Sequence, residues 1–192
     1  MPKLNEKFEH LYNVVSSTNF LNKESLGGEI PFFIAPYDAE QELDCLEEIK
    51  LLKRKLENDG LEILELNLYQ ITCEILDKKG GMDRMFKIEK TKNKDKFLRA
   101  LQSSLNIHQV IMPYIKNKID NENAEVYFLT GIGLVFPFIR SHNILNNLQN
   151  IAKDSPMLAF FPGEYNGQTL NLFGRLKDDN YYRAFNIFKI ES

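Results

Sequence analysis

Residues that could bind a ligand or transfer a proton follow three short apolar segments of this sequence. A glycine turn, Gly131-Ile132-Gly133, follows one segment, and Glu164 follows another. His142 and Glu164 would form an acid–base pair if the fold brought them within hydrogen-bonding reach. Otherwise Arg140 and His142 would only hydrogen-bond the turn. The candidates for one ligand crevice are Asp38, Gly131, Gly133, Arg140, His142, Glu164 and Tyr165.

The glycine turn lacks the motif of a nucleotide hydrolase. A phosphate loop needs several glycines, whose N–H groups wrap the phosphates, and then Lys with Ser or Thr. The chain has no GxxxxGK[ST], and Phe136 stands where a dinucleotide fingerprint needs its third glycine. The GxSxG of serine hydrolases is also absent. We therefore expect a tight turn, no catalytic residue, and a degenerate relative of a P-loop-like fold.

The sequence indicates neither a metal site nor a cofactor. Cys45 and Cys73 have no CxxC spacing and no adjacent His cluster, so we expect ordinary thiols. The acidic residues between positions 40 and 48 precede basic ones in a predicted helix, as the helix dipole favours. We interpret them as a solvated helix face.

The crevice candidates are positioned by a strand–helix–strand unit. Residues 126–129 and 157–161 are almost wholly apolar, as expected of parallel strands covered on both faces. From Phe138 to Ala152, apolar residues recur at helical spacing, with Pro137 suited to the first turn. Ligands of open α/β sheets bind beyond the carboxyl ends of the strands. The loops at 35–38, 130–133 and 162–165 would therefore line the crevice.

The rest of the chain extends this unit. Hydrophobic periodicity predicts helices at 3–17, 39–58 (capped by Asp38), 69–76 and 94–119 (bent or ended at Pro113), and strands at 30–35, 61–68, 168–173 and 181–190. Asn166-Gly167 is typical of a hairpin, and we expect the last two strands to lie antiparallel at one edge. The predicted fold is a single-domain α/β/α three-layer sandwich over residues 1–192, with a mostly parallel sheet.

Charge is distributed unevenly along the chain. The formal net charge is −3, with a pI near 5.7, which gives no global attraction to nucleic acid. Residues 78–99 nevertheless carry nine Lys or Arg against three acids. This segment is either a solvated, partly mobile connection or a surface for nucleic acid or an acidic protein. The candidate nucleic-acid contacts are Lys87, Lys90, Lys92, Lys94 and Lys96.

The sequence predicts a cytoplasmic protein. Its first residues lack the apolar core of a signal peptide, and no apolar run approaches the roughly 20 residues that span a bilayer. We expect no membrane partner.

Three strings of the sequence are distinctive in combination: FFIAPYDAEQEL, TGIGLVFPFIRSHNILNNLQN and FFPGEYNGQTLNLFGRLKDDNYYRAFNI. Together they resemble the BrxB family of the BREX phage-defence systems. The resemblance covers residues 32–187 in order and is weakest in the basic segment. It implies a small cytoplasmic component, encoded beside a large ATPase, an adenine-specific DNA methyltransferase and the alkaline-phosphatase-like protein PglZ. It implies no catalytic activity and offers no catalytic residues to carry over.

The residues and the resemblance together predict a non-catalytic adaptor of a BREX complex. A PglZ-like protein is the preferred partner, the ATPase or the methyltransferase are others, and contact with DNA would be indirect. One alternative is a nucleotide- or phosphate-binding enzyme or regulator at the strand-end crevice. Another is a nucleic-acid-binding module that uses residues 78–99.

Overall fold

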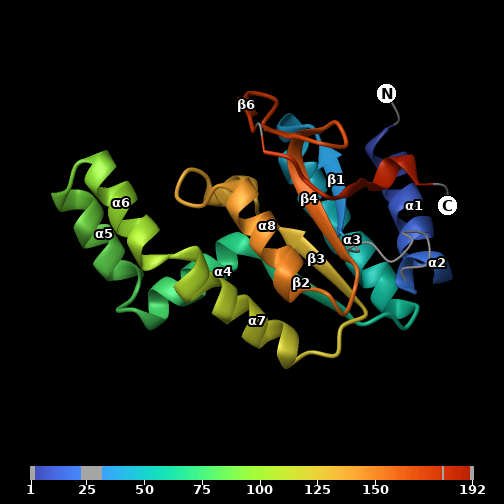
Figure 1. The fold of residues 1–192 in the computed structure, drawn as a ribbon, viewed down its shortest axis with the longest axis horizontal. Helices are drawn as coiled ribbons and strands as arrows, with labels where there is room; N and C mark the ends of the chain where they lie inside the picture. The colour runs from blue at the N-terminus through green and yellow to red at the C-terminus, as the bar shows by residue number, and fades with distance from the viewer. Residues whose placement is uncertain (1–2, 23–31, 179, 191–192) are drawn as a thin grey trace.

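The centre of the protein is a sheet whose main strands are parallel. The computed structural model describes residues 3–22, 32–178 and 180–190 and has the strand order β2-β3-β4-β1-β7. Figure 1 labels the first four of these strands. Adjacent strands along this path pair in parallel. The strands are β1 (Phe32–Tyr37), β2 (Ile63–Asn67), β3 (Val126–Thr130), β4 (Met157–Tyr165) and β7 (Phe185–Asn186). The predicted α/β class and mostly parallel sheet are confirmed.

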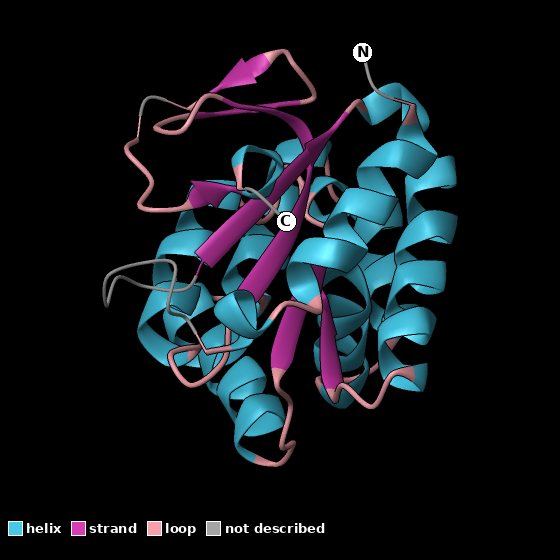
Figure 2. Cartoon of the chain, turned by 90° about the vertical axis from the view of Figure 1, so that its right-hand side faces the viewer, coloured by secondary structure: helices cyan, strands magenta, loops and turns pink. Residues whose placement is uncertain are grey.

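The strand order explains why helices cover both faces of the sheet. From β1 the chain crosses β4 and β3 to reach β2, whereas the next two connections run in the opposite direction. Because crossovers between parallel strands are right-handed, the two directions put their helices on opposite faces. One face carries α1 (Leu4–Val15), α2 (Thr18–Leu21) and α3 (Glu42–Asn58), and the other carries α4 (Leu68–Lys78), α7 (Met112–Asp120) and α8 (Ser141–Ile151). Figure 2 shows the sheet between these helices.

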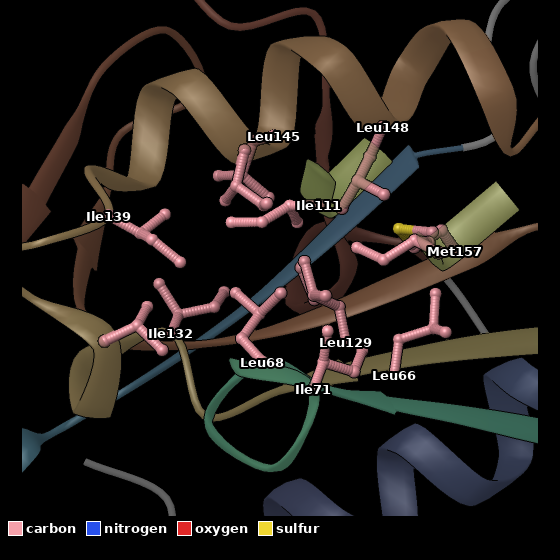
Figure 3. Packing of buried hydrophobic residues seen from close by; sticks show 14 of the residues in the cluster. Leu66, Leu68, Ile71, Ile111, Leu129, Ile132, Ile139, Leu145, Leu148 and Met157 are labelled. Carbon is pink, nitrogen blue, oxygen red and sulfur yellow. The ribbon is translucent and has the colours of Figure 1, made fainter. Parts of the chain in front are cut away.

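Successive residues of each central strand supply the two cores. In β1, Phe33 packs toward α1 and α3, whereas Ile34 packs toward the opposite helices. On the first face, the Phe128 and Phe160 rings meet edge to face with centroids 5.2 Å apart. On the second face, residues of β2, β3 and β4 pack beneath α8 (Figure 3). Both strand faces are apolar because both are buried.

The basic segment forms two helices, and its lysine side chains are exposed to solvent, as the solvated alternative expects. Helices α5 (Met82–Thr91) and α6 (Lys94–Ser104) extend away from the sheet as a helical pair (Figure 1). We call residues 82–104 the basic arm. Met85 is buried against the main core, and Ile88 and Leu101 pack beside it. These apolar contacts hold the arm to the body.

The predicted single helix 94–119 is wrong. After α6 the chain breaks at Asn106, whose side chain accepts a hydrogen bond from the Gln109 N–H at 2.9 Å. A short π-helix (Ile107–Ile111) then leads into α7. Pro113 lies in the first turn of α7, where its missing N–H leaves no intrahelical bond unmade. Asn106 therefore ends the first helix, and Pro113 does not bend the second.

Several predicted boundaries shift. β1 continues through Pro36 to Tyr37, and positions 30 and 31 lie outside the described residues. Asp38 caps as predicted by accepting the Glu40 N–H at 3.0 Å, although the first turn is a 3₁₀ helix, η2 (Ala39–Gln41).

The predicted α8 start is wrong. Ile139 rather than Phe138 is buried, Arg140 is extended, and the helix begins at Ser141, so Pro137 precedes it.

The carboxyl-terminal third contains the largest differences between the predicted and the observed strands. β4 does not stop at Phe161 but continues to Tyr165 and pairs antiparallel with β5 (Leu170–Leu172), which pairs with β6 (Leu176–Lys177). The antiparallel hairpin at Asn166-Gly167 is confirmed. The predicted last strand 181–190 is only β7, and it pairs parallel with β1. The Asn186 side chain caps a 3₁₀ turn, η5 (Ile187–Lys189), which ends that strand.

We expect Leu66→Ala to lower the free energy of unfolding by about 2–5 kcal/mol, because it leaves a cavity at a fully buried site under α8 (Figure 3). Leu43→Ala is the matched control, since Leu43 is 78% exposed on α3 and its loss should change stability by about 0.5 kcal/mol or less. Urea denaturation measures both values. Equal effects would contradict the assignment of the core.

Candidate functional site at the carboxyl ends of the strands

The expected crevice is crossed by the protein's own chain. β4 lies between β3 and β1, and it continues beyond the points where those neighbours end. Its last residues turn back through β5 and β6, a segment we call the strand-end hairpin (residues 163–177). The 162–165 segment is therefore part of a strand and not the loop predicted from sequence. The hairpin therefore occupies part of the space where a ligand of an open sheet would bind and divides what is left of it.

Phe173 belongs to this hairpin, and its ring packs against the glycine turn at Gly133. Its N–H donates to the Pro162 carbonyl at 2.8 Å. A Cβ atom on Gly133 would lie 2.9 Å from both Phe173 Cε1 and Pro162 Cγ, so glycine permits this close packing. Phe173 has φ +58°, an unfavourable value for a bulky residue, which the surrounding contacts must offset. Gly131 has φ +71°, so the predicted tight turn is confirmed.

Asp38, Glu164 and Tyr165 line one hollow of about 390 Å³. The Glu164 carboxylate accepts a hydrogen bond from Asn171 Nδ2 at 2.9 Å. The Tyr165 hydroxyl donates to the Ala184 carbonyl at 2.8 Å, and burial raises its pKa to about 12. Tyr165 is therefore a protonated donor that ties β4 to the segment before β7. Its contacts are structural.

Arg140 and His142 line a different hollow. His142 Nδ1 lies 2.8 Å from Asp178 Oδ2, an ion-pair distance, although the angle is not that of a hydrogen bond. The hypothetical partner Glu164 lines the first hollow, so the structure does not bring the acid–base pair of the sequence analysis together. Five of the seven candidates are divided between two hollows, and Gly131 and Gly133 line neither of them. Sequence reasoning missed Asp178, because an acid in a loop gives no signal of its partner.

Four large apolar side chains are exposed around the filled strand ends. Tyr69 lies in the first turn of α4, which follows β2. Leu134 and Phe136 lie in and after the 3₁₀ turn η4 (Gly133–Val135), which contacts α4. Leu176 lies in β6 and shares a hollow with Phe136. Between 37% and 48% of each side chain is exposed. We call Tyr69, Leu134, Phe136 and Leu176 the strand-end rim. The sequence analysis did not identify it, because its members are adjacent only in the fold.

The candidate nucleic-acid contacts all lie on the basic arm. Lys87, Lys90, Lys92, Lys94 and Lys96 are exposed on or between α5 and α6. Acidic side chains alternate with them, including Asp83, Glu89 and Asp95. Contact between the arm and nucleic acid stays a prediction.

The described ranges, 3–22, 32–178 and 180–190, lack both a metal-ligand cluster and a membrane-spanning helix. They contain no group of three or more His, Cys, Asp or Glu residues arranged to hold a metal ion. None of their helices combines the length and apolar character needed to cross a bilayer.

The family model and the similar proteins all point to one family. A family model described as "BREX protein BrxB" matches residues 64–187. A "BREX protein BrxB" from Bacillus cereus (strain H3081.97) is 38% identical over 191 residues, covering 97% of this chain and 98% of the relative. Another from Escherichia coli O9:H4 (strain HS) is 31% identical over 186 residues, covering 97% of this chain and 92% of the relative. No solved structure is significantly similar, so the expected relation to P-loop folds stays a prediction.

Gly133→Ala should lower the free energy of unfolding by about 1–3 kcal/mol, because the added methyl group meets Phe173 and Pro162. In a Phe173→Ala background the ring is gone, and the same substitution should be less costly by about 1 kcal/mol. Urea denaturation of the two single variants and the double variant measures this coupling. Strictly additive effects would show that Phe173 does not fill the turn.

Cys45 should not react with Ellman's reagent at pH 8 in the folded protein. It is buried at 1% exposure, and burial together with Glu42 raises its pKa to about 12. The measurement uses a Cys73→Ser variant, which leaves Cys45 as the single thiol, and follows thiol release with and without denaturant. Rapid release without denaturant would contradict the packing of α3.

Proposed function

The chain belongs to the BrxB family, which gives it a role in the BREX phage-defence system, and from this premise we propose that it is a non-catalytic adaptor. Other components of the system are its partners. The proposed contact surface is the strand-end rim.

The proposal depends on one observation: the glycine turn at the strand ends is filled by Phe173, and the residues of the rim are apolar and exposed. Where many α/β proteins open a ligand crevice, Phe173 packs on Gly133 and neighbouring side chains point to solvent. Exposed apolar groups gathered on one face are typical of protein interfaces, since a partner removes them from water. An aromatic residue such as Tyr69 is a frequent anchor of such an interface.

The proposed partner is a PglZ-like protein, as the family resemblance implies. The large ATPase and the methyltransferase are the other candidates. In this proposal the chain holds components together and performs no chemistry, and any contact with DNA passes through its partners.

The rim can be tested with a double variant, Tyr69→Ser with Leu134→Ser, in pull-downs against each purified BREX component. We expect binding of one component to fall at least about tenfold, because each anchor of an interface contributes on the order of 1–2 kcal/mol. Leu43→Ser is the matched control, since Leu43 is exposed on α3, on the opposite face of the sheet from α4.

Nuclease treatment and two salt concentrations separate the alternatives. Binding through the basic arm to nucleic acid would vanish with nuclease and fall steeply with salt, because counterions are released from phosphates. Association that resists nuclease but is unchanged by the rim variant would reject the rim as the contact surface.

A further inference from the structure

Three cationic side chains gather in a hollow between the strand-end hairpin and the start of α8. Arg140 precedes α8, and Arg175 and Lys177 lie at the β5–β6 end of the hairpin. They line the same space of about 520 Å³. The whole chain carries a net charge of −3, so this local excess of positive charge does not follow from composition. A concave surface lined by one sign of charge attracts ligands of the other sign.

The acid beside these cations is already engaged. Asp178 has one carboxylate oxygen 2.8 Å from His142 Nδ1, and its other oxygen accepts the Asn180 N–H at 3.1 Å. Within residues 3–22, 32–178 and 180–190, no carboxylate lies within ion-pair distance of Arg140 or Arg175. Among these described residues, both guanidinium groups are therefore free of a carboxylate partner. Each can present two parallel N–H donors to an anion, a geometry that fits phosphate.

The start of α8 adds to this positive field. The helix has 11 residues, and Arg140 at its N-cap position makes no side-chain cap bond to the first turn. The first N–H groups of a helix lack intrahelical partners, and its N-terminus carries a partial positive charge. Here that end faces the hollow that the arginines line, because Ser141 and His142 of the first turn form part of its wall.

The remaining wall is apolar. Phe136, Pro137, Leu172 and Leu176 complete the hollow. Its volume lies within the range of about 300–1,000 Å³ that small-molecule sites commonly have. A free inorganic anion would leave this wall uncovered, whereas a ligand with a ring beside its phosphate would contact it.

We propose that this hollow binds the phosphate of a small phosphorylated organic ligand, with the nucleoside monophosphates as the simplest representatives. Arg140 and Arg175 hold the phosphate at the start of α8, and Phe136, Pro137 and Leu176 contact the organic part. The site differs from a phosphate loop, because the glycine turn packs against Phe173 and takes no part. Phe136 and Leu176 belong both to the strand-end rim and to this hollow, whereas Tyr69 and Leu134 do not line the hollow, so the rim variant and the arginine variants test the two proposals separately.

Isothermal titration of the full chain with AMP at low salt tests the site, with adenosine and inorganic phosphate as the component probes. We expect AMP to bind more tightly than either component and its affinity to fall with salt. Arg140→Gln and Arg175→Gln should each weaken AMP binding at least about tenfold, because each removes charged hydrogen bonds. Arg99→Gln, which removes an exposed arginine from the basic arm, is the matched control and should leave binding unchanged.

Circular dichroism and thermal unfolding keep the test interpretable. Both arginines are exposed, so their Gln variants should unfold at the parent temperature. A 5′-phosphorylated dinucleotide compared with AMP tells whether the phosphate comes from a strand end or from a free nucleotide. The proposal is overturned if AMP does not bind at millimolar concentration, if adenosine binds as well as AMP, or if folded arginine variants bind AMP like the parent.

Discussion

The antiparallel pairing of β4 with β5 is the interaction on which the functional end of the molecule depends. It requires glycine at position 163, where φ is +146° and a Cβ atom would lie 2.2 Å from the Asn171 carbonyl oxygen. This close approach lets β4 continue past its neighbours and turn back over them. As a result, Phe173 reaches the Gly133 turn, and the hairpin brings Arg175 and Asp178 beside α8. The filled glycine turn and the cationic hollow both follow from this one strand extension.

The sequence predicted most of the framework because local patterns determine it. Apolar runs identified β1, β3 and the first half of β4. Asp38 and Gly60 marked the two ends of the segment that contains α3, as expected. The β4 extension was missed because Pro162 and Gly163 are turn-forming residues, and only pairing with β5 makes them strand. The single helix predicted for 94–119 failed for another reason: apolar spacing continues through Asn106, whose side chain caps the next segment.

The candidate site shows the same division between local and long-range information. The turn at Gly131 was predictable, since a strand-to-helix connection with positive φ favours glycine. The partner of His142 was not, because Asp178 lies 36 positions away in the chain and arrives on a hairpin whose course the sequence did not indicate. The rim likewise combines residues that follow different strands. Surfaces of this kind arise from topology, so neither composition nor motif spacing reveals them.

We propose that the chain serves BREX through its surface and not through chemistry at the strand ends. Phage exclusion in cells with an intact BREX system tests this most directly, with the native copy replaced by Tyr69→Ser/Leu134→Ser or by Glu164→Gln at matched protein levels. The account predicts that the rim variant loses exclusion, whereas Glu164→Gln excludes phage like the parent. Loss of exclusion with Glu164→Gln, together with full exclusion by the rim variant, would contradict it.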